Sequence, residues 1–145
     1  MLLKYNTACV QDIILHLKGG EPGFVKQLTA RVDIEGYARK IKTHAHCFEA
    51  WEQDTLIGLV AAYLNAELRF GYITNVSVLP GFQSRGIANL LLNKCINQFG
   101  ISGINTLELE VYKDNERAQR LYLTHGFVVK NSESDFLKMV RCGVE

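Results

Sequence analysis

The stretch from Gln83 to Ala88 has the residue types of a phosphate-binding turn. An apolar run over 72–79 is typical of a buried strand, and it ends at Pro80-Gly81. Apolar residues at helical spacing begin after Gly86, so the stretch lies where a strand leads into a helix. The N–H groups of a first helical turn lack partners within the helix and carry the positive end of its dipole. The small residues at 86 and 88 leave this backbone open to a bulky anion, although an ordinary strand-to-helix turn is an open alternative.

Length and composition predict one globular domain over residues 1–145. Hydrophobic residues make up 48% of the chain and charged residues 21%, a balance typical of soluble proteins. The formal net charge is +1 and no basic stripe occurs, which argues against nucleic acid as the main partner. No apolar run is long enough to span a membrane, and the N-terminus lacks a signal pattern. The four cysteines show no paired spacing, which favours a reducing, cytoplasmic location.

The periodicity of the apolar residues predicts the elements that position this turn. The first half contains a short strand, two helices whose connection holds one further helical turn over 24–28, and three strands joined as an antiparallel meander. The second half has a helix after Gly86, a strand, a helix capped by Asp114 or Asn115 and ended at Gly126, and two final strands. The predicted order is β-α-α-β-β-β-α-β-α-β-β. The predicted strands cover residues 2–5, 47–52, 56–64, 69–79, 106–112, 127–130 and 136–140.

Two motifs of the chain resemble the signatures of the GCN5-related N-acetyltransferase (GNAT) family. Gln83-x-x-Gly86-x-Ala88 matches the family's acyl-CoA pyrophosphate motif, Gln/Arg-x-x-Gly-x-Gly/Ala, at every defined position. The run from Leu109 to Phe127 is similar to the second signature, in which Asn, Ala, Tyr and Gly-Phe recur at these offsets. The resemblance covers nearly the whole chain. It implies a single-domain α/β (α+β) acyl-CoA N-acyltransferase fold, with a mixed, mostly antiparallel sheet and a splayed central strand pair.

The resemblance implies that acetyl-CoA is the co-substrate and that the predicted turn holds its pyrophosphate. Val76 and Val78 would lie on the splayed edge of the strand that admits pantetheine, with the Val78 N–H directed at the thioester oxygen. Asn115 matches the family's pantetheine-contacting asparagine, although a helix N-cap explains this residue as well. The backbone donors for the pyrophosphate would come from Gln83, Ser84, Arg85, Gly86, Ile87 and Ala88.

The implied activity is that of an N-acetyltransferase, in which a primary amine attacks the thioester directly within a ternary complex. Tyr122 matches the family's tyrosine near the CoA sulfur and would protonate the departing thiolate; its alternative is a core aromatic. Glu110 stands where some family members, including protein N-terminal acetyltransferases, have a glutamate base. A strand carboxylate that faces solvent or pairs with a cation is the alternative for Glu110. Asn75 and Ser77 could instead order a water that relays the proton.

The acceptor stays open, because both motifs lie in the catalytic half of the chain. An amino sugar, a small amine or amino-acid derivative, and a peptide or protein N-terminus are the candidates, and residues 19–32 are predicted to bound their site. The alternative function is a non-catalytic acyl-CoA-binding regulatory module. No metal is predicted, because His44 and His46 lack a third ligand nearby. The sequence leaves open whether the chain forms a homodimer.

Overall fold

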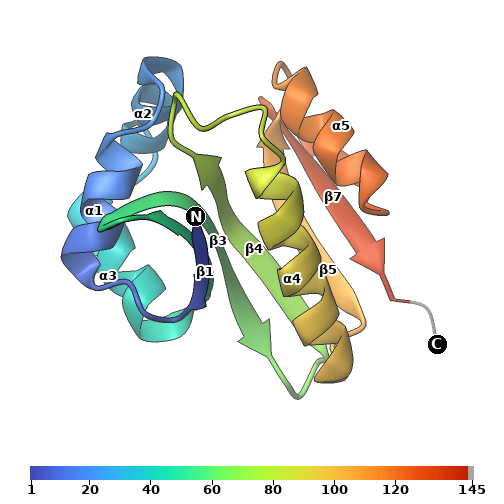
Figure 1. The fold of residues 1–145 in the computed structure, drawn as a ribbon. Helices are drawn as coiled ribbons and strands as arrows, with labels where there is room; N and C mark the ends of the chain where they lie inside the picture. The colour runs from blue at the N-terminus through green and yellow to red at the C-terminus, as the bar shows by residue number, and fades with distance from the viewer. Residues whose placement is uncertain (144–145) are drawn as a thin grey trace.

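The computed structural model describes residues 1–143, which contain seven strands and five helices (Figure 1). The strands are β1 (Leu2–Tyr5), β2 (His46–Glu52), β3 (Thr55–Asn65), β4 (Phe70–Val78), β5 (Thr106–Tyr112), β6 (Val128–Glu133) and β7 (Phe136–Cys142). The helices are α1 (Val10–Lys18), α2 (Pro22–Thr29), α3 (Ile34–His44), α4 (Ile87–Ile101) and α5 (Glu116–Thr124). The predicted domain of residues 1–145 ends in two residues, 144–145, that lie outside the described residues.

One mixed sheet separates two layers of helices. α1, α2 and α3 lie on one face of the sheet, and α4 and α5 lie on the other (Figure 1). The strand order is β1-β2-β3-β4-β5-β7-β6, and β4 pairs with β5 in parallel. Every other neighbouring pair of described strands is antiparallel. The predicted α/β (α+β) fold with its mixed, mostly antiparallel sheet is therefore confirmed.

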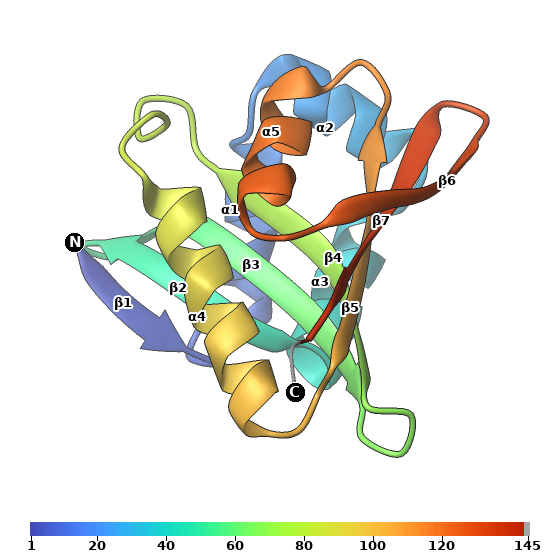
Figure 2. The same cartoon turned by 90° about the vertical axis from the view of Figure 1, so that its right-hand side faces the viewer.

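The two central strands separate along their length. β4 and β5 pair only from Phe70 opposite Thr106 to Tyr72 opposite Glu108. Beyond this short ladder they diverge, so they lie together at one end and apart at the other (Figure 2). β4 continues to Val78, and its second half therefore has no strand neighbour on the β5 side. The predicted splayed strand pair is thus present.

A β-bulge bends β4 just before its unpaired half. The register with β3 shifts between Ala61 and Ala62, which leaves Thr74 as an extra residue on β4. The hydroxyl of Tyr37 on α3 donates to the Thr74 carbonyl oxygen at 2.7 Å and lies 2.8 Å from the Thr74 Oγ1. Burial raises the pKa of Tyr37 to about 12, so its hydroxyl stays a donor at neutral pH. α3 therefore holds the bulge in place.

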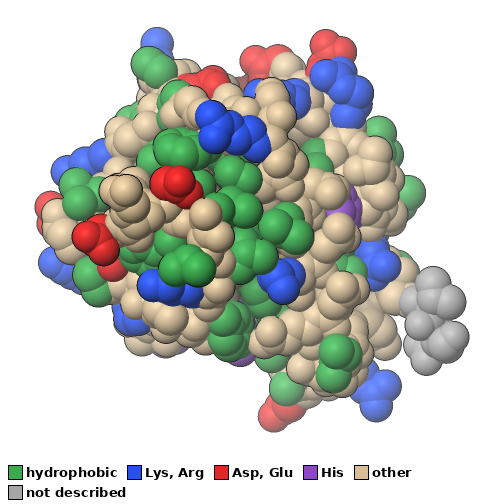
Figure 3. Space-filling view, viewed as in Figure 1, with side chains coloured by type: hydrophobic (Ala, Val, Ile, Leu, Met, Phe, Trp, Pro, Cys, Tyr) green, Lys and Arg blue, Asp and Glu red, His purple; other side chains and the backbone are tan. Residues whose placement is uncertain are grey.

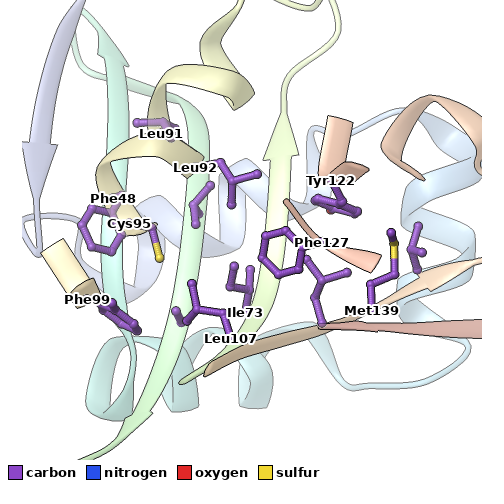
Figure 4. Close-up of a cluster of buried hydrophobic side chains, with 14 of the residues drawn as sticks. Phe48, Ile73, Leu91, Leu92, Cys95, Phe99, Leu107, Tyr122, Phe127 and Met139 are labelled. Atoms are coloured by element: carbon purple, nitrogen blue, oxygen red, sulfur yellow. The ribbon is translucent and has the colours of Figure 1, made fainter. Parts of the chain in front are cut away.

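Two hydrophobic clusters attach the helices to the sheet. The cluster under α4 and α5 joins Leu91 and Phe99 of α4 to Leu107 of β5, and it extends to Tyr122 and Phe127 (Figure 4). The cluster on the opposite face includes Ile13, Leu17, Ala38, Ile41, Leu56 and Leu59. Because alternate residues of a strand point to opposite faces, β2 and β3 contribute different side chains to each layer.

α2 is longer than the sequence predicted, so three helices precede β2 where the predicted order had two. Pro22 occupies the first helical position, where its missing N–H costs nothing and its restricted φ suits a helix. None of the side chains of α2 is buried. Phe24, Val25 and Leu28 pack against the cluster on the α1–α3 face only as half-buried side chains. The helix is short and includes Gly23, a poor helix former, which is why the sequence indicated only one turn here.

On the face seen in Figure 3, hydrophobic side chains gather near the middle, and most basic and acidic side chains lie around them. None of the helices within residues 1–143 is long and apolar enough to cross a membrane. The same residues contain no group of three or more His, Cys, Asp or Glu arranged to hold a metal ion.

Tyr37→Phe should destabilise the protein by about 1–2 kcal/mol, because the Thr74 carbonyl loses its donor while the ring and its packing stay. Urea unfolding should show this as a lower midpoint. Tyr112→Phe is the matched control, because Tyr112 packs through its ring on Phe136. Equal midpoints for the two variants would contradict a role of Tyr37 in holding the bulge.

Candidate active site

A cavity of about 330 Å³ opens beside the unpaired half of β4. Its walls are the end of β4, the turn into α4, the start of α5 and the connection between α1 and α2. All of the predicted site residues except Arg85 and Glu110 line it. These are Val76, Val78, Gln83, Ser84, Gly86, Ile87, Ala88, Asn115 and Tyr122. The two sequence motifs, which are far apart in the chain, therefore meet at one cavity.

The turn between β4 and α4 presents backbone donors that no side chain caps. Gly86 is the N-cap residue, with φ of 78°, and the first turn of α4 contains no acidic residue. Ser84 also has a positive φ, 64°, which costs an L-residue about 1–2 kcal/mol and is common in concave anion-binding turns. A Cβ on Gly86 would meet nothing within 4 Å, so the space before the helix is open. The turn therefore has the geometry of an anion site at a helix N-terminus.

Two arginines flank this turn in different ways. Arg117 of α5 lines the cavity and donates to Gln83 Oε1 at 3.3 Å and to Ser84 Oγ at 3.2 Å. The sequence analysis did not single out Arg117, although its place just after the cap of α5, within the second motif, was the available signal. The Arg85 side chain instead lies over the Phe82 ring, 5.3 Å from its centroid, and is exposed.

The end of β4 offers a backbone donor to the gap between the splayed strands. The Leu79 N–H donates to the Ile57 carbonyl oxygen of β3 at 2.9 Å. Because backbone groups alternate in direction along a strand, the Val78 N–H points away from β3 and toward the β5 side. The Gln83 side-chain amide donates to the Val78 carbonyl oxygen on that side at 3.1 Å. The predicted donor at Val78 thus points toward the gap between β4 and β5.

α5 brings two of the predicted residues to the cavity, and each also has a structural role. The Asn115 Oδ1 accepts from the Ala118 N–H at 3.1 Å, so Asn115 is a helix N-cap. Tyr122 is 6% exposed and packs edge-to-face on Phe127 with ring centroids 6.0 Å apart (Figure 4). Burial raises the pKa of Tyr122, so its hydroxyl stays protonated. Tyr122 borders the cavity.

Glu110 lies on the opposite face of the sheet from Tyr122. Its neighbours Leu109 and Val111 point into the cluster under α4 and α5, so the Glu110 side chain points toward α1–α3. Its Oε1 accepts from the Tyr72 hydroxyl at 3.2 Å and lies 3.4 Å from Nη2 of Arg31. Burial and the Glu110 charge raise the pKa of Tyr72, so this hydroxyl remains a donor. The cation contact that the sequence allowed for Glu110 is present in the structure.

A histidine to which the sequence analysis gave no role in the site lines the cavity. His16 of α1 is buried, with its Nδ1 2.7 Å from the Leu56 carbonyl oxygen and its Nε2 2.8 Å from Ser77 Oγ. The Asn75 amide donates to the same Ser77 Oγ at 2.9 Å. Burial lowers the pKa of His16 to about 4, so the ring is neutral at pH 7. The sequence signal that could have identified His16 was its position: it is a polar residue next to Leu17 on the apolar side of an amphipathic helix.

The sequence model of the Acetyltransferase (GNAT) family matches residues 15–127, which include both motifs and all the walls of the cavity. The chain belongs to the GNAT family. The predicted family is therefore confirmed.

Relatives of this GNAT chain include two named ribosomal protein bS18-alanine N-acetyltransferase. The Haemophilus ducreyi protein is 42% identical over 76 residues, which cover 52% of this chain and 51% of that protein. The Salmonella typhimurium protein is 32% identical over 107 residues, which cover 62% of this chain and 72% of that protein. The alignment thus spans only about half of the length of the first relative.

Solved structures share the fold of this GNAT chain. The ribosomal-protein-S18-alanine N-acetyltransferase of Escherichia coli has a TM-score of 0.80 at 16% identity, covering 99% of this chain and 96% of that chain. The PaiA N-acetyltransferase of Thermoplasma acidophilum, solved in complex with coenzyme A, has a TM-score of 0.74 at 16% identity. The match covers 98% of this chain and 99% of that chain. At a sequence identity of 16%, this structural similarity shows the fold alone.

The neutral state of His16 predicts a pH-dependent stability for this GNAT domain. The pKa of His16 is about 4 in the folded protein and about 6.5 in the unfolded chain. Below pH 6.5 the unfolded chain therefore binds the extra proton, and stability falls as the pH drops from about 6.5 to 4. This difference in pKa corresponds to about 3 kcal/mol.

His16→Gln should remove this contribution, because the variant has no group to protonate at that position. Urea unfolding at pH 7 and pH 4 measures it as the pH-dependent part of the stability difference between wild type and variant. His44→Gln, at an exposed position, is the control for replacing any histidine. If the wild type loses no more stability between pH 7 and pH 4 than His16→Gln does, then His16 is not held neutral in the folded protein.

Proposed function

We propose that the protein transfers the acetyl group of acetyl-CoA to the α-amino group of a protein or peptide N-terminus. The observation that carries the proposal is the single cavity that joins the uncapped start of α4, the free edge of β4 and the α1–α2 connection. The similarity to proteins named ribosomal protein bS18-alanine N-acetyltransferase supports an N-terminal acceptor.

The turn at the start of α4 fits the pyrophosphate of coenzyme A. Its donors are backbone N–H groups from Gln83 to Ala88, and the lack of an acidic residue in the first helical turn favours an anion there. Arg117 adds a guanidinium group beside Ser84, where it would pair with a phosphate oxygen. Acetyl-CoA would supply an acetyl thioester at the end of a pantetheine arm that lies along the free edge of β4.

Two groups of the chain then act at the thioester. The Val78 N–H, which faces the gap between β4 and β5, would donate to the carbonyl oxygen and stabilise the negative charge that develops on it. The Tyr122 hydroxyl, kept protonated by burial, would give its proton to the departing thiolate, whose pKa is about 8.5 by analogy with cysteine. Asn115 would contact the pantetheine arm from the start of α5.

Glu110 is the proposed proton acceptor on the other side of the splayed strands. It points toward α1–α3, the side from which an acceptor would enter, and its side chain is 28% exposed. The contact with Arg31 is long, at 3.4 Å, and Arg31 is itself exposed, so the ion pair is weak and would yield to a water or an amine. Glu110 lies outside the lining of the cavity, so a bridging water would carry the proton to it.

The acceptor end of the cavity has the chemistry of an ammonium site. Glu21 lines it and forms no ion pair within residues 1–143, so its carboxylate is available to attract a cationic amine. Phe24 lines the same end and offers an apolar surface to a small side chain. One carboxylate suits one α-ammonium group, whereas a polyamine would favour several acidic residues.

A thiol-release assay with acetyl-CoA and a panel of amines tests the proposed function. Peptides that begin with alanine should release coenzyme A and gain an acetyl group on the α-amine, located by tandem mass spectrometry. The same peptides with a blocked N-terminus are the control, and they should be inert even when they contain lysine. Turnover of amino sugars without turnover of peptides would contradict the N-terminal acceptor. Coenzyme A binding without any turnover would favour the non-catalytic acyl-CoA-binding module.

Gly86→Glu should weaken coenzyme A binding by about tenfold or more in calorimetry, because a carboxylate at the helix N-terminus competes with and repels the pyrophosphate. Gly86→Ala is the matched control, because it introduces the same strain at positive φ without the charge. Gly100→Glu adds the same charge at the exposed far end of α4. If Gly86→Glu and Gly100→Glu bind coenzyme A equally well, the pyrophosphate does not lie at this turn.

A further inference from the structure

The directions of the hydrogen bonds around His16 follow from its partners. The Leu56 carbonyl oxygen can only accept, so the hydrogen of the ring must lie on Nδ1. Because the buried ring is neutral, its Nε2 has no hydrogen and can only accept. The remaining partner of Nε2 is the Ser77 hydroxyl, at 2.8 Å. Ser77 must therefore donate its hydrogen to His16.

A second bond determines what Ser77 can still do. The Asn75 Nδ2 donates to the Leu59 carbonyl oxygen at 3.1 Å and to Ser77 Oγ at 2.9 Å, which uses both amide hydrogens. Asn75 is 7% exposed and His16 is 3% exposed, so both partners of Ser77 are shielded from bulk water. Ser77 Oγ is left with one free lone pair and no free hydrogen. Ser77 itself is only half-buried and lines the cavity.

The lone pair of Ser77 lies at the acceptor end of the cavity. Its side chain points to the α1 face of β4, where Glu21 and Phe24 also line the cavity. The next residue along the strand is Val78, whose N–H faces the gap where the thioester oxygen would lie. An amine that attacks this thioester would therefore pass beside Ser77 Oγ.

We propose that Ser77 binds the attacking amine by accepting a hydrogen bond from one of its N–H groups, and that His16 and Asn75 are positioning residues that hold the serine hydrogen away from the amine. The inference rests on the proposed function and names the group that orients its acceptor. A neutral primary amine has two N–H groups and one lone pair. When one N–H is held by Ser77, the lone pair is free to attack.

The orientation of the hydroxyl matters, because a serine that rotated freely would also offer its hydrogen to the amine nitrogen. That hydrogen bond would occupy the lone pair that has to attack the carbonyl carbon. His16 prevents it by taking the serine hydrogen. In this arrangement His16 stays neutral throughout, and the proton of the amine leaves by another route.

Steady-state kinetics with an alanine-initiated peptide and saturating acetyl-CoA test the inference. Ser77→Ala should lower kcat/KM for the peptide about tenfold and change KM for acetyl-CoA less than twofold. His16→Phe keeps the ring but frees the serine hydrogen, so it should cause a similar loss. His16→Gln should restore part of the rate, because its amide oxygen reaches the place of Nε2. Ser132→Ala, at an exposed position of β6, is the control.

The double variant that combines His16→Phe with Ser77→Ala distinguishes a positioning role of His16 from a general loss of packing. If His16 acts through Ser77, then His16→Phe should cause no further loss of kcat/KM once Ser77 is alanine. Additive losses would overturn the inference. The pH profile of kcat/KM should keep its shape in His16→Phe, and loss of its acidic limb would make His16 a proton acceptor instead.

Nitrogen NMR of His16 gives a readout that does not depend on turnover. The ring should be the tautomer with hydrogen on Nδ1, and it should not titrate between pH 7 and pH 5. The other tautomer, or titration near pH 6.5, would overturn the inference. Wild-type protein that acetylates no amine would defeat the proposed function, whereas an active wild type with an unaffected Ser77→Ala variant would defeat this inference alone.

Discussion

The separation of β4 from β5 is the constraint on which the rest of the site depends. At the closed end β4 and β5 pack closely. Gly71 makes this possible, because a Cβ at position 71 would lie only 2.7 Å from the Leu107 side chain. At the open end the bulge at Thr74 and the short parallel ladder leave backbone donors of β4 without strand partners. In an ordinary sheet those donors would be satisfied, and there would be no opening from one face to the other.

This opening connects two faces of the sheet that hold different chemistry. On the α4–α5 face lie the uncapped start of α4, Arg117 and the hydroxyl of Tyr122, a combination suited to an anion and to proton donation. On the α1–α3 face lie Glu110 and Ser77, whose hydroxyl gives its hydrogen to the neutral His16 and keeps one lone pair free. In the proposed reaction the thioester meets the first set and the amine meets the second, and Ser77 and Tyr122 line the same cavity while Glu110 lies outside its lining.

The sequence predicted the fold, the turn at the start of α4 and the start of α5 well, because these depend on local rules. The strand-to-helix turn at Gly86 and the N-cap at Asn115 are recognisable from a few neighbouring residues, and both lie where they were expected. The acceptor end was harder. The apolar side chains of α2 are only half-buried, and the Glu110–Arg31 contact joins residues from opposite halves of the chain. No local pattern contains such a contact.

The sequence by itself determined the family, the order of most elements and the turn that offers backbone donors to an anion, since periodicity, capping residues and glycine positions act over a few residues. Only the tertiary structure decided which polar groups meet across the sheet: that Arg117 reaches the turn, that Arg31 contacts Glu110, and that His16 takes the hydrogen of Ser77. The physical reason is that burial and hydrogen-bond direction depend on every neighbour of a group, and these neighbours come together only when the helices pack on the splayed sheet.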